Sequence, residues 1–180
     1  MIVSGLVAYH PDLEPLMVPI DDIQQHPQNY NNGDLDAIAE SIEVNGMYRP
    51  IFVQKTTRYI VAGNHTWAAC KMLDATDIPV IWLDVSDQAA KKILLADNRT
   101  ADLALPDTPA LLRMLDSLGD DIVGTGWTDH TIELLRLAQD AAENTPLGTP
   151  AGDPFLTITC PNCGHTWTRG SMMEPPKPPG

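Results

Sequence analysis

The sequence has few of the features that mark secreted or membrane proteins. Its three cysteines are an odd number and too few for a disulfide framework. No apolar run approaches the roughly eighteen residues that a transmembrane helix needs. The N-terminal stretch MIVSGLVAYHPDLEP lacks the basic start and clean apolar segment of a secretory signal. These absences predict a cytoplasmic protein with no membrane segment.

Basic residues are also scarce. The chain has 11 Lys and Arg against 24 Asp and Glu, for a net charge of −13. Residues 101–150 carry nine acidic residues and only Arg113 and Arg136. Tight non-specific binding to duplex DNA depends on Lys and Arg at the phosphates, so we expect direct duplex binding to be weak. A single phosphorylated ligand is not excluded, because one helix N-terminus can hold an anion on an acidic protein.

Strand and helix patterns alternate up to about residue 104 and predict one α/β (α+β) domain. Short apolar, β-branched runs indicate strands, and apolar residues three and four apart indicate helices. His26 is interpreted as a loop residue before Pro27. The predicted strands lie within 16–23, 49–54, 58–63 and 77–85, and the predicted helices within 34–46, 65–75 and 86–103.

The remaining residues form a helical extension and a small C-terminal part. We assign 1–104 to the α/β domain, 105–143 to the extension, 144–154 to a linker, 155–169 to a CxxC knuckle and 170–180 to a disordered tail. In the extension, Thr108 is expected to cap a helix that starts with Pro109. The leucines expected to face inward are Leu111, Leu112, Leu115 and Leu118. A second helix is expected from Thr128 or Asp129.

The string CPNCGHTW is typical of a zinc knuckle, since two thiolates at this spacing can share one metal ion. Cys160 and Cys163 are the expected zinc ligands, and His165 is a third candidate. Two chains of a homodimer could instead supply a shared four-thiolate site. The alternative interpretation is a vestigial or redox-active cysteine pair.

The string YIVAGNHTWAAC carries the most chemical information. A predicted strand ends at Gly63, and an Ala-rich helix starts directly after it. Glycine allows an unusual backbone angle and close approach of a ligand, which a side chain would obstruct. The N–H groups of Asn64, His65 and Thr66 would open the helix without backbone acceptors and so favour an anion. Many α/β folds turn in this way for structural reasons alone, which is the alternative.

The order of segments resembles the N-terminal domain of ParB-like proteins and of sulfiredoxin. The resemblance rests on VPIDDIQQHPQNY, DLDAIAESIEVNGMYRPIFV, YIVAGNHTWAACKMLDATDIPVIWLD and LLADNRTADL. It implies a ParB/sulfiredoxin-like fold and a nucleotide ligand such as CTP or ATP. It also implies Mg²⁺ at Asp97, for which a solvated helix end is the alternative. The ligand-binding positions that it implies are Gly63, Asn64, His65, Thr66, Gln28, Arg49, Asn98 and Arg99.

The chain departs from the family pattern after the glycine. Only Gly63 and Ala69 of the family's charged motif are kept, so several arginines that hold a triphosphate are absent. The reactive cysteine of sulfiredoxin belongs at the position of Asn64, which excludes sulfinic-acid reductase activity. Cys70 lies almost two turns into the helix and cannot replace it.

Three functions fit these patterns. The first is a regulator that binds a nucleotide or phosphate ligand in a DNA-related process. The second is an Mg²⁺-dependent enzyme (a nucleotide hydrolase, phosphotransferase or nuclease) with His65, Glu40 or Asp97 as catalytic candidates. The third is an adaptor for a protein partner that modifies or packages DNA. The GTGWTD turn resembles extensions behind ParB-like nuclease domains of phage-encoded proteins, which implies a phage protein in the host cytoplasm.

Overall fold

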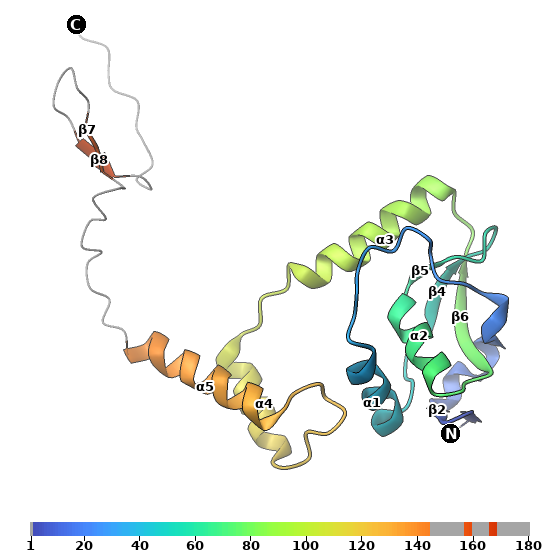
Figure 1. Ribbon diagram of the computed structural model, residues 1–180, viewed down its shortest axis with the longest axis horizontal. Coiled ribbons are helices and arrows are strands. Elements are labelled where there is room, and N and C mark those ends of the chain that lie inside the picture. The colour runs from blue at the N-terminus through green and yellow to red at the C-terminus, as the bar shows by residue number, and fades with distance from the viewer. Residues whose placement is uncertain (1, 145–156, 160–165, 169–180) are drawn as a thin grey trace, which may run out of the picture. The chain divides into compact units, whose positions relative to one another are not determined.

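The computed structural model describes residues 2–144, 157–159 and 166–168 (Figure 1). The chain divides into two compact units, Met1–Arg136 and Leu137–Gly180. The first unit contains the predicted α/β domain and most of the helical extension. Within the described residues, no helix is long and apolar enough to cross a membrane.

A four-stranded mixed sheet forms the centre of the first unit. Its strands run in the order β3 (Met17–Pro19), β6 (Asp77–Leu83), β4 (Ile51–Gln54) and β5 (Ile60–Ala62). The two central strands, β4 and β6, are parallel, and each outer strand is antiparallel to its neighbour. The longest strand, β6, is the apolar run expected for a strand buried between layers.

Three helices complete the α/β domain: α1 (Leu35–Asn45), α2 (Asn64–Met72) and α3 (Asp87–Asp102). Helices α1 and α2 pack against each other, while α3 contacts β5 (Figure 1). Asp34 caps α1 through a 3.0 Å hydrogen bond from Ala37 N, and the helix ends at Gly46, within the predicted range 34–46. Ser86 caps α3 in the same manner, accepting from Ala89 N.

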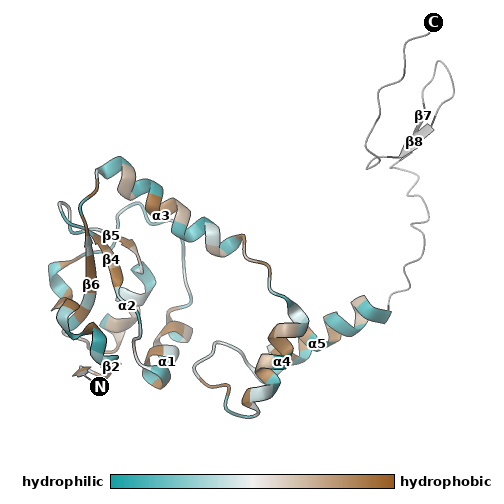
Figure 2. Cartoon of the chain, turned by 180° about the vertical axis from the view of Figure 1, so that it is seen from behind, coloured by the Kyte–Doolittle hydropathy of each residue, from teal (hydrophilic) through white to brown (hydrophobic). Residues whose placement is uncertain are grey.

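The apolar side chains of the sheet and of the inner helix faces form one core. The strands β4, β5 and β6 are coloured as hydrophobic in Figure 2. Burial of these side chains is the main term that stabilises the domain. The completely buried side chains include Val7, Tyr9, Val53, Ile60, Cys70 and Ile78. The mixed α/β fold class predicted from the sequence is confirmed.

The sequence patterns did not reveal the structure before residue 17. There, β1 (Ile2–Ser4) and β2 (Val7–Tyr9) form a two-stranded antiparallel hairpin, followed by a 3₁₀ helix over Pro11–Leu16. A second 3₁₀ helix, Ile20–Asp22, follows β3. The hairpin is tied to the start of β6, because Ser4 Oγ accepts from the N–H groups of Thr76 and Asp77.

The helical extension contains α4 (Thr108–Leu118) and α5 (Asp129–Asn144). Two details of the prediction for α4 were wrong. The cap is Asp107 and not Thr108, because the Asp107 carboxylate accepts from Ala110 N at 3.0 Å. Leu118, which was expected to face inward, is 42% exposed, whereas Leu115 is buried.

In the second unit, β7 (Thr157–Thr159) pairs with β8 (Thr166–Thr168) in an antiparallel hairpin. The proposed zinc ligands Cys160, Cys163 and His165 lie outside the described residues. Zinc binding at this knuckle therefore stays a prediction.

Candidate functional site

The turn from β5 into α2 has the geometry that the sequence predicted. Gly63 is the N-cap of α2 and has φ +92°, in the left-handed region that favours glycine. The first hydrogen bond of the helix runs from Trp67 N to Gly63 O at 3.0 Å. In the described part of the chain, the N–H groups of Asn64, His65 and Thr66 have no backbone acceptor. They are therefore free to bind an anion.

A small polar cavity of about 150 Å³ lies at this turn. Three segments that are distant in the sequence form its walls: the start of α2, the 29–33 loop before α1, and α3 near its C-terminal end. Local propensity cannot bring these segments together, so their convergence is a consequence of the fold. The lining residues are Asn29, Ile38, Arg49, Gly63, Asn64, His65, Thr66, Asp97 and Asn98.

The Asn64 side chain is used within the protein. It is buried, its Oδ1 accepts from His26 N at 3.0 Å, and its Nδ2 donates to Ile60 O at 3.2 Å. The family resemblance placed Asn64 among the ligand-binding positions. In the structure it holds the 26–28 loop against β5, which leaves the Asn64 backbone N–H as its donor toward the cavity.

The His65 imidazole joins α2 to the loop that precedes α1. Its Nε2 lies 2.9 Å from Asn31 O and 3.0 Å from Gly33 N. One tautomer donates to the carbonyl and the other accepts from the N–H group, so Nε2 has a partner in either form. His65 therefore positions the loop wall of the cavity.

Asn98 secures the other side of the same loop. Its side chain accepts from Asn31 Nδ2 at 3.5 Å and donates to Asn29 Oδ1 at 3.4 Å. These long amide contacts link α3 to the loop, which explains why Asn98 reaches the cavity from a position 35 residues beyond Gly63. Asp97 lines the cavity beside it.

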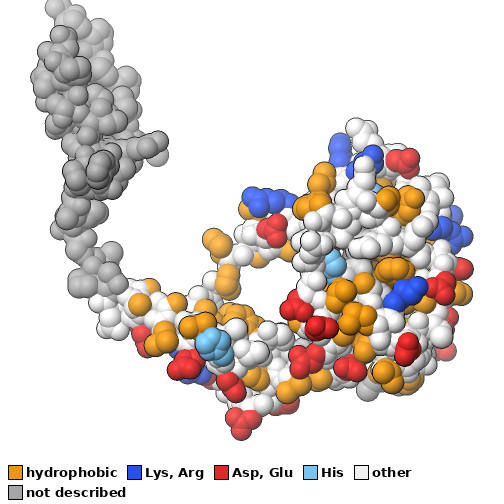
Figure 3. Space-filling view, in the orientation of Figure 1, with side chains coloured by type: hydrophobic (Ala, Val, Ile, Leu, Met, Phe, Trp, Pro, Cys, Tyr) orange, Lys and Arg blue, Asp and Glu red, His pale blue; other side chains and the backbone are white. Residues whose placement is uncertain are grey.

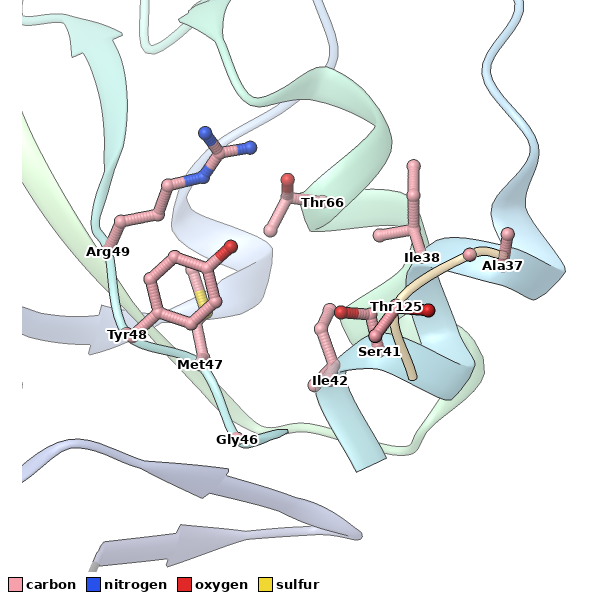
Figure 4. Close-up of a pocket in the computed structure, with 11 residues that line it drawn as sticks. Ala37, Ile38, Ser41, Ile42, Gly46, Met47, Tyr48, Arg49, Thr66 and Thr125 are labelled. Carbon is pink, nitrogen blue, oxygen red and sulfur yellow. The ribbon is translucent and has the colours of Figure 1, made fainter. Parts of the chain in front are cut away.

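Arg49 connects this cavity with two neighbouring hollows. A pocket of about 270 Å³ lies between α1 and the 46–49 segment, and a smaller one of about 90 Å³ lies beside β4. Arg49 and Thr66 line all three. In Figure 4 the Arg49 guanidinium extends toward Thr66, and the Tyr48 hydroxyl points across the same pocket. The three hollows thus adjoin each other around Arg49.

The charges at the cavity are few but opposite in sign. Arg49 is the only Lys or Arg among the described lining residues, and Asp97 is the only acidic one. Within the described chain, no three His, Cys, Asp or Glu side chains are grouped so that they could hold a metal ion by themselves. Asp97 could still hold Mg²⁺ jointly with a phosphate ligand, since Mg²⁺ commonly uses one or two carboxylates together with substrate phosphates and water.

Three residues that the sequence grouped with the site lie elsewhere. Gln28 and Arg99 are exposed and do not line the cavity. Glu40, a candidate base, lines a different groove between α1 and the 120–129 segment. The cavity therefore contains two of the three catalytic candidates, His65 and Asp97.

Cys70 has a structural role, as the sequence indicated. The side chain is fully buried in α2, with its Sγ 3.8 Å from Met47 Sδ. Burial raises the pKa of the thiol to about 12, so the nucleophilic thiolate is not formed at neutral pH.

His26 is a supporting residue that sequence reasoning missed. It is 6% exposed, packs against the Tyr59 ring at 5.5 Å, and accepts from Gln28 N through Nδ1. Burial, and secondarily the nearby Lys91, lower the pKa of His26. The HPQN sequence around it gave no indication of burial, because its contact with Asn64 spans 38 positions.

We expect stability to fall as the pH drops below about 6.5, the ordinary pKa of histidine. The unfolded chain then binds a proton at His26 more readily than the folded chain does, because the folded pKa is lowered. Protonation of Nδ1 also removes the acceptor for Gln28 N. The measurement is the urea midpoint between pH 7.5 and 5.0.

His26→Asn keeps an acceptor near the position of Nδ1 but cannot titrate. This variant should lose less stability over that pH range than the parent chain does. The matched control is His130→Asn at an exposed histidine, which should keep the parent's pH dependence. Equal pH dependence in the parent and in His26→Asn would contradict the assignment.

Taken together, these features define an α/β domain that presents a glycine-to-helix turn and a polar cavity suited to an anionic group. Residues 12–99 match the family model of the ParB N-terminal domain. This segment is therefore a ParB-like N-terminal domain, as the order of segments in the sequence predicted.

Curated relatives support the same assignment. The chain is 33% identical to a probable chromosome-partitioning protein ParB of Coxiella burnetii over 118 residues, which are 59% of this chain and 41% of that protein. It is 34% identical to a probable plasmid-partitioning protein ParB of Deinococcus radiodurans over 77 residues, which are 42% of this chain and 26% of that protein. It is 27% identical to the nucleoid occlusion protein of Lysinibacillus sphaericus over 118 residues (61% and 40%). The chain thus spans less than half the length of these relatives.

Among solved structures, the chain is similar to a C-terminally truncated chromosome-partitioning protein ParB of Caulobacter crescentus in complex with CTP-γ-S. The match has a TM-score of 0.49 and 22% identity, and covers 59% of this chain and 63% of that chain. The same protein in complex with the centromeric parS site matches with a TM-score of 0.40 and 19% identity, over 66% of this chain and 63% of that one.

Proposed function

We propose that this ParB-like domain binds a nucleotide, with the phosphates at the Gly63 turn, and acts as a ligand-binding regulator in a DNA-related process. The observation that carries the proposal is the polar cavity where the α2 N-terminus, the 29–33 loop and Asp97–Asn98 meet. Free N–H groups at a helix start favour negative charge, and Arg49 adds a positive charge on the same cavity.

The sizes of the adjoining hollows support a nucleotide over a lone phosphate ion. The cavity of about 150 Å³ is small compared with sites for drug-sized ligands, which start at roughly 300 Å³. The neighbouring pocket of about 270 Å³ is more apolar and is lined by Ile38, Ile42, Met47 and Tyr48. It would receive the nucleoside while the phosphates lie at the turn, and Arg49, which lines both, would contact the ligand between them.

We further propose that Mg²⁺ binds together with the phosphates. Asp97 is the one carboxylate on the described wall of the cavity. When bound, the ion would neutralise phosphate charge that the single Arg49 leaves unpaired. Asp97 would act as its protein ligand, and Asn98 would keep this part of α3 near the loop through its amide contacts.

A binding role fits the site better than catalysis does. Each His65 tautomer uses Nε2 to contact the loop, and Glu40 lies in another groove. Among its described lining residues, the cavity therefore offers Asp97, but no second acidic residue, for acid–base chemistry. An Mg²⁺-dependent hydrolase, phosphotransferase or nuclease is the second candidate function, and the test below includes it.

We propose that the domain acts in a partition-like or phage-related process in the cytoplasm. The ParB relatives supply the DNA-related context, and the net charge of −13 favours weak, salt-sensitive contact with duplex DNA by this chain. A protein partner or a second copy of the chain would then supply further function. Zinc at Cys160 and Cys163, with His165 or with a second chain, would stabilise such an assembly.

The proposal predicts that a nucleotide raises the melting temperature. The test is a thermal-shift panel of CTP, ATP, GTP and ADP, each with and without Mg²⁺. At about 100 times Kd a ligand stabilises the folded state by about 2.7 kcal/mol, which shifts the melting temperature by several degrees. Mg²⁺ should increase the shift in the parent chain but not in Asp97→Asn.

Chromatography of the same samples shows whether the nucleotide is converted. Unchanged nucleotide with a clear thermal shift supports the regulator, whereas product formation supports the enzyme. If none of the four nucleotides changes the melting temperature, nucleotide binding is contradicted and the adaptor function is favoured.

A further inference from the structure

A second, larger groove lies on the first unit, beside the pocket of about 270 Å³, with which it shares Ala37 and Gly126. Its volume is about 880 Å³, and its walls are the N-terminal half of α1 and the 120–129 segment that joins α4 to α5. The apolar part of its lining consists of Ala37, Ile122, Val123 and Trp127. Val123 is 55% exposed, so an apolar surface is open to solvent there.

The groove is held in shape by contacts between its two walls. Asn45 Nδ2 donates to Gly124 O at 3.0 Å, which ties the end of α1 to the 120–129 segment. Gly124 lies so close to Val44 that an added Cβ would be 2.7 Å from the Val44 Cβ. Within the segment, Thr125 N donates to Ile122 O, and Thr125 Oγ1 accepts from Trp127 N. A partner would therefore meet a groove that is already formed.

The rim of the groove is strongly acidic. Asp34, Asp36, Glu40, Asp120 and Asp129 line it, and no Lys or Arg is among the described lining residues. Asp34 has a local role as the cap of α1. None of the five takes part in the ion pairs found in the described part of the chain, which involve Asp12, Asp21 and Asp116. Figure 3 shows acidic side chains with hydrophobic ones between them over α1 and the extension.

We propose that this groove is a docking site for a protein segment that carries Lys or Arg around an apolar side chain. Charge complementarity to the acidic rim requires a positively charged partner, which excludes nucleic acid because its phosphates are negatively charged. The open apolar floor, with Val123 and Trp127, would gain from contact with an apolar side chain.

Two other occupants, a metal ion and a second copy of this chain, fit the groove less well. A bound metal ion would need ligands that converge, and in the described residues no three His, Cys, Asp or Glu side chains do so. A second copy of this chain would bring a net charge of −13 to an acidic groove, which is repulsive. A basic segment of a different protein fits both the rim and the floor.

The experiment uses the full chain and a labelled, amidated peptide with Lys and Leu at helical spacing. Fluorescence anisotropy gives its Kd, and amide chemical shifts show where it binds. Glu40→Lys should weaken binding by at least about tenfold, because like charges face each other in the groove. The matched control is Glu43→Lys, which makes the same charge change on the same helix outside the groove.

Glu43→Lys should weaken binding clearly less than Glu40→Lys does at 0.15 M salt, because Glu43 does not line the groove and its charge acts on the peptide only through screened solvent. Val123→Ser, which leaves the charge unchanged, should weaken binding severalfold if an apolar side chain docks on the floor. Chemical shifts should change mainly at Ala37, Glu40 and the 120–129 segment.

Several results would overturn the proposal. Equal losses in Glu40→Lys and Glu43→Lys would mean that the peptide responds only to the overall charge. An unaffected Val123→Ser variant, or displacement of the peptide by spermine at similar charge concentration, would mean that the groove binds cations and not a protein segment. Absence of peptide binding, or shifts confined to other surfaces, would show that the groove is not a docking site.

Discussion

Gly63→Ala is expected to lower the free energy of unfolding by about 2–4 kcal/mol, because two costs add. A non-glycine residue at φ +92° is strained, and an added Cβ would lie 2.5 Å from Ile51 Cγ2. That side chain belongs to the core, so it has little room to move. Urea unfolding followed by tryptophan fluorescence measures the change.

The matched control is Gly126→Ala. Gly126 also has a positive φ, of +79°, but an added Cβ would meet no atom within 4 Å. This variant should cost only about 1–2 kcal/mol, the cost of the backbone conformation alone. Equal losses at the two positions would show that the overlap with Ile51 has no energetic consequence.

This geometry changes how the glycine should be interpreted. From the sequence, a side chain at position 63 was expected to obstruct the approach of a phosphate. In the structure, the Cβ would point toward Ile51 in the core. Gly63 is thus required first for the turn itself, and binding lost in a Gly63 variant would follow from disturbance of the fold. Substitutions on the cavity wall are the cleaner test of the ligand site.

Arg49→Ala is expected to weaken nucleotide binding by about 10- to 150-fold, since hydrogen bonds to charged groups contribute roughly 1.5–3 kcal/mol. Arg49 is the only Lys or Arg among the described residues of the cavity, and it also lines both adjoining hollows. Stability should change little, because the guanidinium has no ion-pair partner in the described chain. Isothermal titration with the nucleotide that gives the largest thermal shift measures the effect.

Arg99→Ala is the control, since it removes the same charge from an exposed position that does not line the cavity. It should reduce affinity by less than about threefold, through the long-range field alone. If Arg99→Ala has the larger effect, Arg99 contacts the ligand, as the family resemblance implied. The cavity that Arg49 lines is then not the binding surface.

Much of the domain could be predicted from local signals. Asp34 and Gly46 mark the ends of α1 because capping is a property of a few neighbouring residues. The prediction of Thr108 as the cap failed because Asp107, directly before it, is an equally good capping residue, and only the bond from Ala110 N identifies it. The hairpin before residue 10 also had a signal, since Gly5 interrupts two short apolar runs, but those strands have only three residues each.

The site was predictable in outline and not in its contacts. A strand, a glycine and a helix in succession place Gly63 at an anion-binding turn, and the family order of segments brings Asp97 to the same cavity. The family order could not show that Asn64 Oδ1 would accept from His26 N, or that His65 Nε2 would contact the 31–33 loop. These contacts depend on side chains more than 30 positions apart, whose distances no periodicity encodes.

The strand order of the sheet has a consequence for synthesis of the chain. Strand β3 pairs with β6, so Met17 cannot form its strand pairing until Pro79, 62 positions later in the chain, has been synthesised. The last wall of the cavity, Asp97–Asn98, comes later still. Contacts between such distant segments slow folding, because a long loop must close before they form. A nascent chain on the ribosome therefore cannot form the complete cavity until residue 98 has left the exit tunnel, and ligand capture follows synthesis of the whole α/β domain.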